Sequence, residues 1–238
     1  MPGLEAAWVN SALAIHNATW PDSPLQSPDD LRRRLTNAAD DARASGLPWI
    51  FYVFEPETPA AVMEQADAIA AAFNIHPMGQ LRVMLGDTAA LTPPLHPLPA
   101  ADLFRVTTTE HATMALDLNT RAYGMPDFIT ASVVESGAYF RDPRRDFGFV
   151  ALNTAGEPVA TTTVIELKGW IYVAAVATAP EHRRQGYAEL VMREALRAAS
   201  AATGITRTAL DASLLGASLY SQMGYKASGD LWRMYVSM

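Results

Sequence analysis

Residues 179–196, APEHRRQGYAELVMREAL, combine side chains and spacing that could bind an anion. Arg183 and Arg184 supply positive charge and fork-shaped donors that suit a phosphate group. Gly186 has no side chain, so an anion can approach the backbone closely there. The residues that follow predict a helix, whose first amides lack internal partners and whose dipole adds partial positive charge. Together these features indicate a site for a pyrophosphate.

The surrounding elements put this segment at the end of a buried strand. Residues 171–176, IYVAAV, are apolar on both alternating faces, which is typical of a central strand. Pro180 ends the strand, because proline cannot donate to a strand ladder. Apolar residues then recur at helical spacing and predict a helix over 187–203. The alternative is a surface turn with solvated arginines, but the position after a buried strand favours ligand binding.

Composition limits the classes of partner. The chain has 238 residues, a formal net charge of −7 and no cysteine. The negative charge argues against nucleic acid or an anionic membrane as the main partner. The lack of cysteine excludes disulfides, thiolate metal sites and a cysteine nucleophile, and the five scattered histidines lack metal-ligand spacing, so no metal is expected. Without a signal-like leader or a long apolar run, the protein is expected to be cytoplasmic.

A proline-rich stretch, residues 86–101, suggests the main domain boundary, because dense prolines favour an extended connector. We therefore expect an N-terminal α/β region over 1–86, a linker over 87–102 and a second domain over 103–238. Helices are expected at 27–46, 59–73, 109–123, 129–140, 187–203 and 216–223. Strands are expected at 49–55, 79–87, 103–107, 147–153, 157–167, 169–178, 207–212 and 229–238.

The chain also contains a weak internal similarity. Residues 45–85 and 203–236 each read as a glycine-terminated helix, a strand, a helix and a closing Gly-x-Leu-x-x-Met strand. This pattern fits an ancient half-duplication, and it also fits a chance likeness between two α/β stretches.

Two motifs, taken in order, resemble a known family. Arg183-x-x-Gly186-x-Ala188 is similar to the acetyl-CoA loop Q/R-x-x-G-x-G/A of the GNAT N-acetyltransferase superfamily. Residues 210–226, LDASLLGASLYSQMGYK, resemble the closing segment of that family, L-Y-x-x-x-G-F/Y, through Leu219, Tyr220, Gly224 and Tyr225. The resemblance covers residues 103–238, and it implies an α/β (α+β) fold with a mixed, mostly antiparallel central sheet flanked by helices. The region 1–86 would then be a degenerate half-repeat or an unrelated α/β cap.

The resemblance also implies a function and a set of site residues. The chain would be an acetyl-CoA-dependent N-acetyltransferase that moves an acetyl group to a primary amine by direct attack on the thioester. Tyr220 would act as general acid for the departing thiolate, and the amide of Val176 would stabilise the developing oxyanion. Ser213 stands where relatives carry a polar residue that contacts the cofactor. The remaining cofactor-binding residues would be Val176, Ala177 and Thr178 along the pantetheine, and Arg183, Arg184, Gln185, Gly186, Tyr187, Ala188 and Glu189 around the pyrophosphate.

Other interpretations of these residues stay open at this stage. Tyr220 could be a packing tyrosine, and Ser213 could cap the helix that follows it. No general base is obvious: Thr208 stands where some relatives carry glutamate, and Glu166 and Glu135 are candidates that also fit a surface role. The missing base favours a second hypothesis, a non-catalytic acyl-CoA-binding regulatory module. The acceptor would be a small-molecule or peptide amine, selected by residues 123–129 and the N-terminal region; the sequence predicts no oligomeric state.

Overall fold

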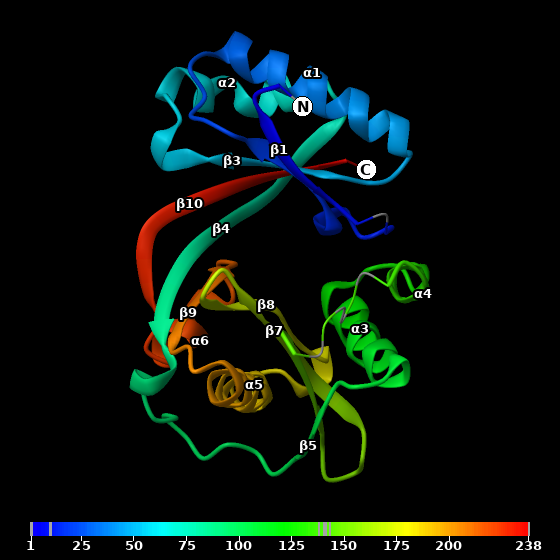
Figure 1. The fold of residues 1–238 in the computed structure, drawn as a ribbon, viewed down its shortest axis with the longest axis vertical. Coiled ribbons are helices and arrows are strands. Elements are labelled where there is room, and N and C mark those ends of the chain that lie inside the picture. Colours follow the sequence, from blue (N-terminus) through cyan, green and yellow to red (C-terminus); the bar gives the residue numbers. More distant parts are fainter. Residues whose placement is uncertain (1, 10, 138, 140–141, 143, 238) are drawn as a thin grey trace. The chain divides into compact units, whose positions relative to one another are not determined.

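The computed structural model describes residues 2–9, 11–137, 139, 142 and 144–237, and it divides the chain into two units (Figure 1). Unit 1 comprises Met1–Val83 and Gly229–Met238, and unit 2 comprises Met84–Ser228. This division differs from the expected boundary in the proline-rich segment. Residues 87–102 belong to unit 2, and Gly229–Met238 belong to unit 1, because residues 232–236 pair with a strand of unit 1.

Unit 1 contains a small sheet and two helices. β1 pairs antiparallel with β2, β2 pairs parallel with β3, and β3 pairs antiparallel with β10. The elements are β1 (Leu4–Trp8), β2 (Asn17–Pro21), α1 (Pro28–Ser45), β3 (Ile50–Phe54), α2 (Ala60–Ala71), β4 (Ile75–Asp87) and β10 (Lys226–Ser237). β4 and β10 each run from one unit into the other.

The core of unit 1 lies between its helices and one face of its strands. Leu31 and Leu35 of α1 and Val62 of α2 are buried in one cluster with Phe51 of β3 and Tyr235 of β10. The cap signals read from the sequence explain the bounds of α1. The Ser27 hydroxyl accepts a hydrogen bond from the amide of Asp30, and Gly46 ends the helix in the left-handed region at φ 65°.

Unit 2 is built on five consecutively neighbouring strands in the order β9-β8-β7-β6-β5, with the end of β4 beside β9. Among the pairs of unit 2 for which the register is described, β8–β9 is parallel, and β5–β6, β6–β7 and β7–β8 are antiparallel. The elements are β5 (Asp102–Arg105), α3 (Thr109–Tyr123), α4 (Phe128–Glu135), β6 (Asp146–Leu152), β7 (Pro158–Leu167), β8 (Trp170–Thr178), α5 (Tyr187–Thr203), β9 (Arg207–Ala212) and α6 (Ala217–Gln222).

Helices cover the sheet of unit 2. The apolar stripe of α5 packs on one face, where Met192 and Leu196 are buried with Ile171, Val173 and Leu210 of β8 and β9. On β6, Val150 belongs to a separate cluster with α3, formed by Val106, Ala112, Ala115 and Leu118. Because side chains alternate along a strand, residues of β8 and β9 that do not face α5 project from the opposite face.

The expected fold class, a mixed and mostly antiparallel sheet flanked by helices, is confirmed. Helices 109–123 and 187–203 and the strand 207–212 have the predicted bounds. β1 and β2 were not predicted, and α4 ends earlier than expected; Ala138 and Phe140, which the sequence analysis put in that helix, lie outside the described residues. Within the described ranges, no helix is long and apolar enough to cross a membrane.

Candidate active site

The site forms where β8 separates from β9. The two strands pair from Ile171↔Thr208 to Val173↔Leu210 and no further, although β8 continues to Thr178 in register with β7. The register with β7 shifts at this point: Val173 lies opposite Val164 and Ala175 opposite Thr163, so Ala174 is an extra residue. Such a bulge bends its strand and increases the local twist. The bulge thus opens the edge of β8 that faces β9, from Ala174 onward.

The open edge of β8 carries unused backbone groups. The carbonyl of Val176 accepts a hydrogen bond from the Tyr123 hydroxyl at 2.9 Å instead of serving a strand ladder. In an antiparallel pair, the amide and carbonyl of one residue point to the same side, so the Val176 amide points to the side of that hydroxyl, away from β7. At the end of the strand, the Thr178 hydroxyl is buried and has no hydrogen-bond partner among the described residues.

The loop after β8 exposes a row of backbone amides. Gly186 has φ 88° and Arg184 has φ 63°, so the chain turns sharply into α5. The first helical bond is donated by Leu190 to the carbonyl of Gly186. In the described part of the chain, no backbone or side-chain acceptor receives a hydrogen bond from the amides of residues 184–189. These amides lie at the positive end of the α5 dipole, which suits an anion.

Two arginines in this loop have different environments. Arg183 donates to the carbonyl of Ala122 at 2.5 Å and to that of Thr178 at 3.4 Å, so it ties the loop to the end of α3. Arg184 is exposed and makes no ion pair or hydrogen bond with any residue that the structure describes. The guanidinium of Arg184 is therefore available to a ligand, whereas that of Arg183 has a structural contact.

The proline-rich segment packs against the same loop. A Cβ at Gly186 would lie 3.1 Å from Cδ of Pro99 and 3.9 Å from Cδ2 of Leu98. Further back, the amide of Thr92 donates to Met223 and its carbonyl accepts from Arg193. The segment that was expected to be an extended linker thus contacts unit 2 at Thr92 and at Leu98 and Pro99.

Tyr220 lies half-buried on α6 beside the apolar cluster under α5. Its ring meets that of Tyr225 edge-on with 6.2 Å between centroids. The Tyr220 hydroxyl has no hydrogen-bond partner among the described residues, and a Cβ at Gly216 would touch the Tyr220 ring at 3.0 Å. Burial raises the pKa of Tyr220 above its ordinary value, and the phenols of Tyr123 and Tyr225 raise it further. The phenol therefore stays protonated at neutral pH.

Ser213 lies in the turn before α6, whose N-cap residue is Gly216. The Ser213 hydroxyl accepts a hydrogen bond from the amide of Gly216 at 3.2 Å. The side chain is exposed, so this contact leaves one side of the hydroxyl open to solvent. The remaining predicted cofactor residues have mixed roles in the fold: the ring of Tyr187 is buried in the core, and Glu189 pairs with Arg193.

The carboxylates proposed from the sequence as general base lie away from the opening. Glu166 stands at the far end of β7, where the Gly169 amide and Arg145 lower its pKa. Glu135 is exposed at the end of α4. Thr208 is buried, and its hydroxyl shares a hydrogen bond with the Tyr225 hydroxyl at 3.0 Å.

Asp211 is a carboxylate that the sequence analysis did not single out. It is the first residue of β9 beyond the last pair with β8, and it is half-buried. Tyr172 of β8 donates a hydrogen bond to Oδ2 of Asp211 at 2.8 Å. Both side chains project from the face opposite α5, since their neighbours Val173 and Leu210 face α5. Burial raises the pKa of Asp211, and the hydrogen bond from Tyr172 offsets part of that rise. The contact joins residues far apart in sequence, so no local signal could have revealed it.

Two further features bear on ligands. A hollow of about 630 Å³ follows α3 and is lined by Glu110, Asp117 and Pro158 and by Asp127 of the predicted acceptor segment 123–129, but by none of the predicted catalytic or cofactor-binding residues. In the described ranges, no group of three or more histidine or acidic residues could hold a metal ion.

Comparison with known proteins agrees with this geometry. The model of the acetyltransferase (GNAT) family matches residues 113–225. No curated protein matches the chain. A GCN5-related N-acetyltransferase from Kribbella flavida is 17% identical, with a TM-score of 0.70 over 99% of this chain and 86% of that one.

Two other solved structures have a similar fold. A GCN5-related N-acetyltransferase from Sphaerobacter thermophilus is 16% identical, with a TM-score of 0.64 over 98% of this chain and 75% of that one. A tandem GNAT protein from the clavulanic acid biosynthesis pathway is 18% identical, with a TM-score of 0.59 over 92% and 74% of the two chains. At these identities the likeness establishes the fold.

The residues at the opening fit acetyl-CoA. The free amides of residues 184–189 match a pyrophosphate, and the open edge of β8 and the unbonded Thr178 hydroxyl offer polar partners to an extended amide chain. A family whose members use acetyl-CoA matches this same part of the chain. Residues 113–225 therefore match the GNAT acetyltransferase family in sequence and fold, and this fold implies acetyl-CoA-dependent acyl transfer in general.

Proposed function

We propose that the chain is an acetyl-CoA-dependent N-acetyltransferase that acts on a primary amine. One observation carries this proposal: β8 parts from β9 next to a row of unbonded amides and beside an unbonded phenol on α6. When bound, acetyl-CoA would supply an acetyl thioester whose C–S bond breaks as the amine nitrogen bonds to the acetyl carbon. Every other part of the reaction would depend on groups of this chain.

The chain would hold the cofactor through backbone groups. Amides of residues 184–189 would bind the pyrophosphate, with the exposed guanidinium of Arg184 beside it. Val176, Ala177 and Thr178 would present the open strand edge to the pantetheine. Arg183 would act indirectly, since its guanidinium fixes the loop against the end of α3.

Two donors would stabilise developing charge. The amide of Val176 would donate to the carbonyl oxygen, because it points into the opening and lies on a rigid strand. Tyr220 would donate to the leaving sulfur. A phenol is ordinarily a weaker acid than a thiol, and burial raises the pKa of Tyr220 further, so its contribution is a hydrogen bond rather than complete proton transfer.

Asp211 would accept the proton that the amine loses. It lies at the point where the strands part, it keeps one carboxylate oxygen free of hydrogen bonds from the described residues, and no charged side chain among them pairs with it. The raised pKa brings the carboxylate closer to the pH at which a general base is effective. Tyr172 would orient the carboxylate through Oδ2.

The acceptor would be a small-molecule or peptide amine. Between α3 and α4, Tyr123 is 64% exposed and Phe128 is 62% exposed, so the segment that was expected to select the acceptor offers two aromatic side chains. In the turn before α6, Leu214 and Leu215 are 76% and 94% exposed. Exposed apolar residues around the opening favour an amine with an apolar part.

The alternative, a regulatory module that binds acyl-CoA without catalysis, makes a different prediction. Calorimetry with acetyl-CoA should show about one site per chain, with affinity that weakens as salt increases. Thiol release in the presence of a panel of primary amines then separates the two functions. Release that requires an amine supports the enzyme, binding without release supports the module, and no heat at millimolar acetyl-CoA refutes both.

A further inference from the structure

Unit 1 repeats part of the topology of unit 2. In unit 2, β7 and β8 form an antiparallel pair, β8 leads into α5, and β9 returns parallel to β8. In unit 1, β1 and β2 form an antiparallel pair, β2 leads into α1, and β3 returns parallel to β2. The helices α1 and α5 both end at a left-handed glycine, Gly46 and Gly204. This order supports the half-duplication read from residues 45–85 and 203–236.

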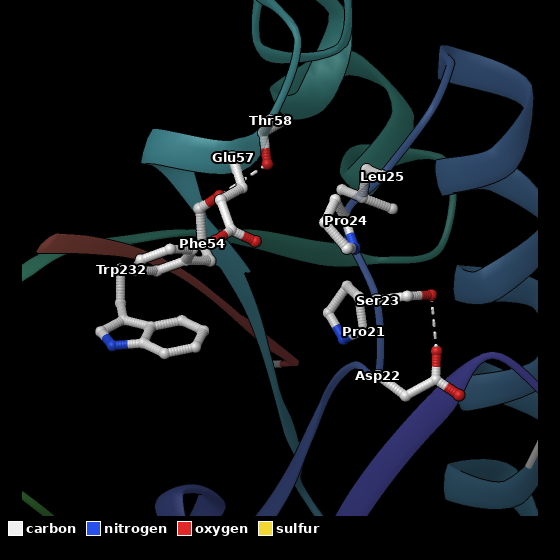
Figure 2. A pocket seen from close by; sticks show the side chains of 9 residues that line it. All are labelled: Pro21, Asp22, Ser23, Pro24, Leu25, Phe54, Glu57, Thr58 and Trp232. Carbon is white, nitrogen blue, oxygen red and sulfur yellow. Dashed lines mark hydrogen bonds between the residues drawn. The ribbon is translucent and has the colours of Figure 1, made fainter.

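The parallel pair of unit 1 also opens. β2 and β3 pair at Ala18↔Ile50 and Thr19↔Phe51 only. β2 continues to Pro21 along β1, and β3 continues to Phe54 along β10. A hollow of about 220 Å³ lies where the two strands part (Figure 2). Within its own unit, this hollow has the same place in the topology as the cofactor site has in unit 2.

The chemistry of the repeat has changed at the helix start. The Ser27 hydroxyl accepts a hydrogen bond from the amide of Asp30, and the Asp30 carboxylate accepts one from the amide of Gln26. Pro28 has no N–H to donate. Arg34 is buried and bound to Asp30 and Asp22. Two of the amides at this helix start and the cation that a phosphate would need are therefore already bonded, and acidic side chains lie beside them.

The walls of the hollow favour a cation instead. Phe54 and Trp232 lie on one side, with 4.9 Å between ring centroids and their planes tilted by 48°, and Pro21 and Pro24 lie on the other (Figure 2). The carboxylate of Glu57 lies between these walls in the view of Figure 2, and it has no ion pair or hydrogen bond with any described residue. An indole face and a free carboxylate together attract an organic cation.

We propose that the hollow in unit 1 binds a small organic ammonium ion with an apolar body, held over Trp232 and paired with Glu57. The site is distinct from the acyl-transfer site, and its volume suits a fragment-sized ligand rather than a nucleotide.

Benzyltrimethylammonium is the probe, because a quaternary nitrogen cannot accept an acetyl group and so cannot report on the reaction. Titration of the full chain by ligand-observed NMR should give saturable binding that weakens with salt. Glu57→Gln should weaken binding at least fivefold, because it deletes the charge of an exposed side chain without burying a new group. Glu64→Gln, an exposed change on α2, is the matched control and should leave binding unchanged.

Phenylacetate tests the sign of the charge and should not bind. The absence of saturable binding, equal weakening by the two glutamate variants, or tighter binding of phenylacetate would each overturn the proposal. Acetyl-CoA binding measured on the same Glu57→Gln sample should be unchanged, so failure here leaves the acyl-transfer proposal intact.

Discussion

Replacing Tyr220 with phenylalanine isolates one atom of the proposed mechanism. The hydroxyl makes no hydrogen bond with the described residues, so its removal breaks no contact within the fold. The free energy of unfolding should therefore change by no more than about 0.5 kcal/mol. The phenyl ring keeps its contacts with Gly216 and Tyr225, so the shape of the site should be preserved.

The raised pKa of Tyr220 sets the size of the expected effect. A phenol with a pKa above its ordinary value of about 10 cannot give its proton completely to a thiolate whose acid has a pKa of about 8.5. Its contribution is then a hydrogen bond to a charged group, about 1.5–3 kcal/mol. This corresponds to a fall in turnover of roughly 10- to 150-fold, at the low end of the range for general acids.

The assay compares turnover at saturating acetyl-CoA with the cofactor dissociation constant. Tyr220→Phe should lower the first and leave the second nearly unchanged. Tyr225→Phe is the matched control: it should destabilise the fold by about 1–3 kcal/mol, because it leaves the buried Thr208 hydroxyl unpaired, and it should spare turnover. Turnover of Tyr220→Phe equal to that of the unchanged chain would refute the reasoning and strengthen the binding-module alternative.

Three further substitutions in the site, and Gly204→Ala as a control outside it, test other parts of the mechanism. Gly186→Ala and Gly204→Ala both place alanine in the left-handed region, at φ 88° and 73°, so each should lower the free energy of unfolding by about 1–2 kcal/mol. Calorimetry should show weaker acetyl-CoA binding for Gly186→Ala and unchanged binding for Gly204→Ala. Asp211→Asn should abolish the acidic limb of the pH–rate profile, which lies above the ordinary carboxyl range because the pKa of Asp211 is raised. For the same reason, the free energy of unfolding of the unchanged chain should fall as the pH rises from the ordinary carboxyl pKa to the raised one, and that of the asparagine variant should not. A limb that survives in Asp211→Asn would exclude this carboxylate as the base. Alanine is allowed at position 216, where φ is −80°, but its Cβ would lie 3.0 Å from the Tyr220 ring. Gly216→Ala should therefore lower turnover roughly tenfold with little change in cofactor affinity. Equal losses of turnover and affinity would instead indicate a general distortion of the site.

Local signals predicted much of unit 2. The bounds of α3 follow from Thr108, whose hydroxyl caps the helix, and from Gly124 at φ 63°. The end of α5 follows in the same way from Gly204. β1 and β2 escaped prediction because they are short, and most of β1 is exposed, so no clear apolar alternation marks them. Helix bounds were thus predictable where the capping residue or glycine that fixes them lies next to the helix in sequence.

The candidate site also contains features with local sequence signals and features without them. The amide-rich start of α5 was predictable, since glycine and arginine before an amphipathic helix have a local meaning. The opening itself depends on the bulge at Ala174, which arises from the register between two strands. The Tyr172–Asp211 contact joins positions 39 residues apart and needs the parallel pairing of β8 and β9. Neither feature is encoded in a contiguous motif.

The core of each unit is built from segments on both sides of the proline-rich stretch. Met84 of β4 is only 2% exposed in the core of unit 2, and Gly86 lies against Tyr225, so unit 2 takes its strand beside β9 from residues before the proline-rich segment. Unit 1 takes β10 from the end of the chain, where Tyr235 is buried in its core. A cut within residues 87–102 would therefore leave each core without an apolar strand. Each unit therefore contains a strand from the other side of the proline-rich segment, and neither of the two fragments that such a cut produces would contain all the residues of one unit.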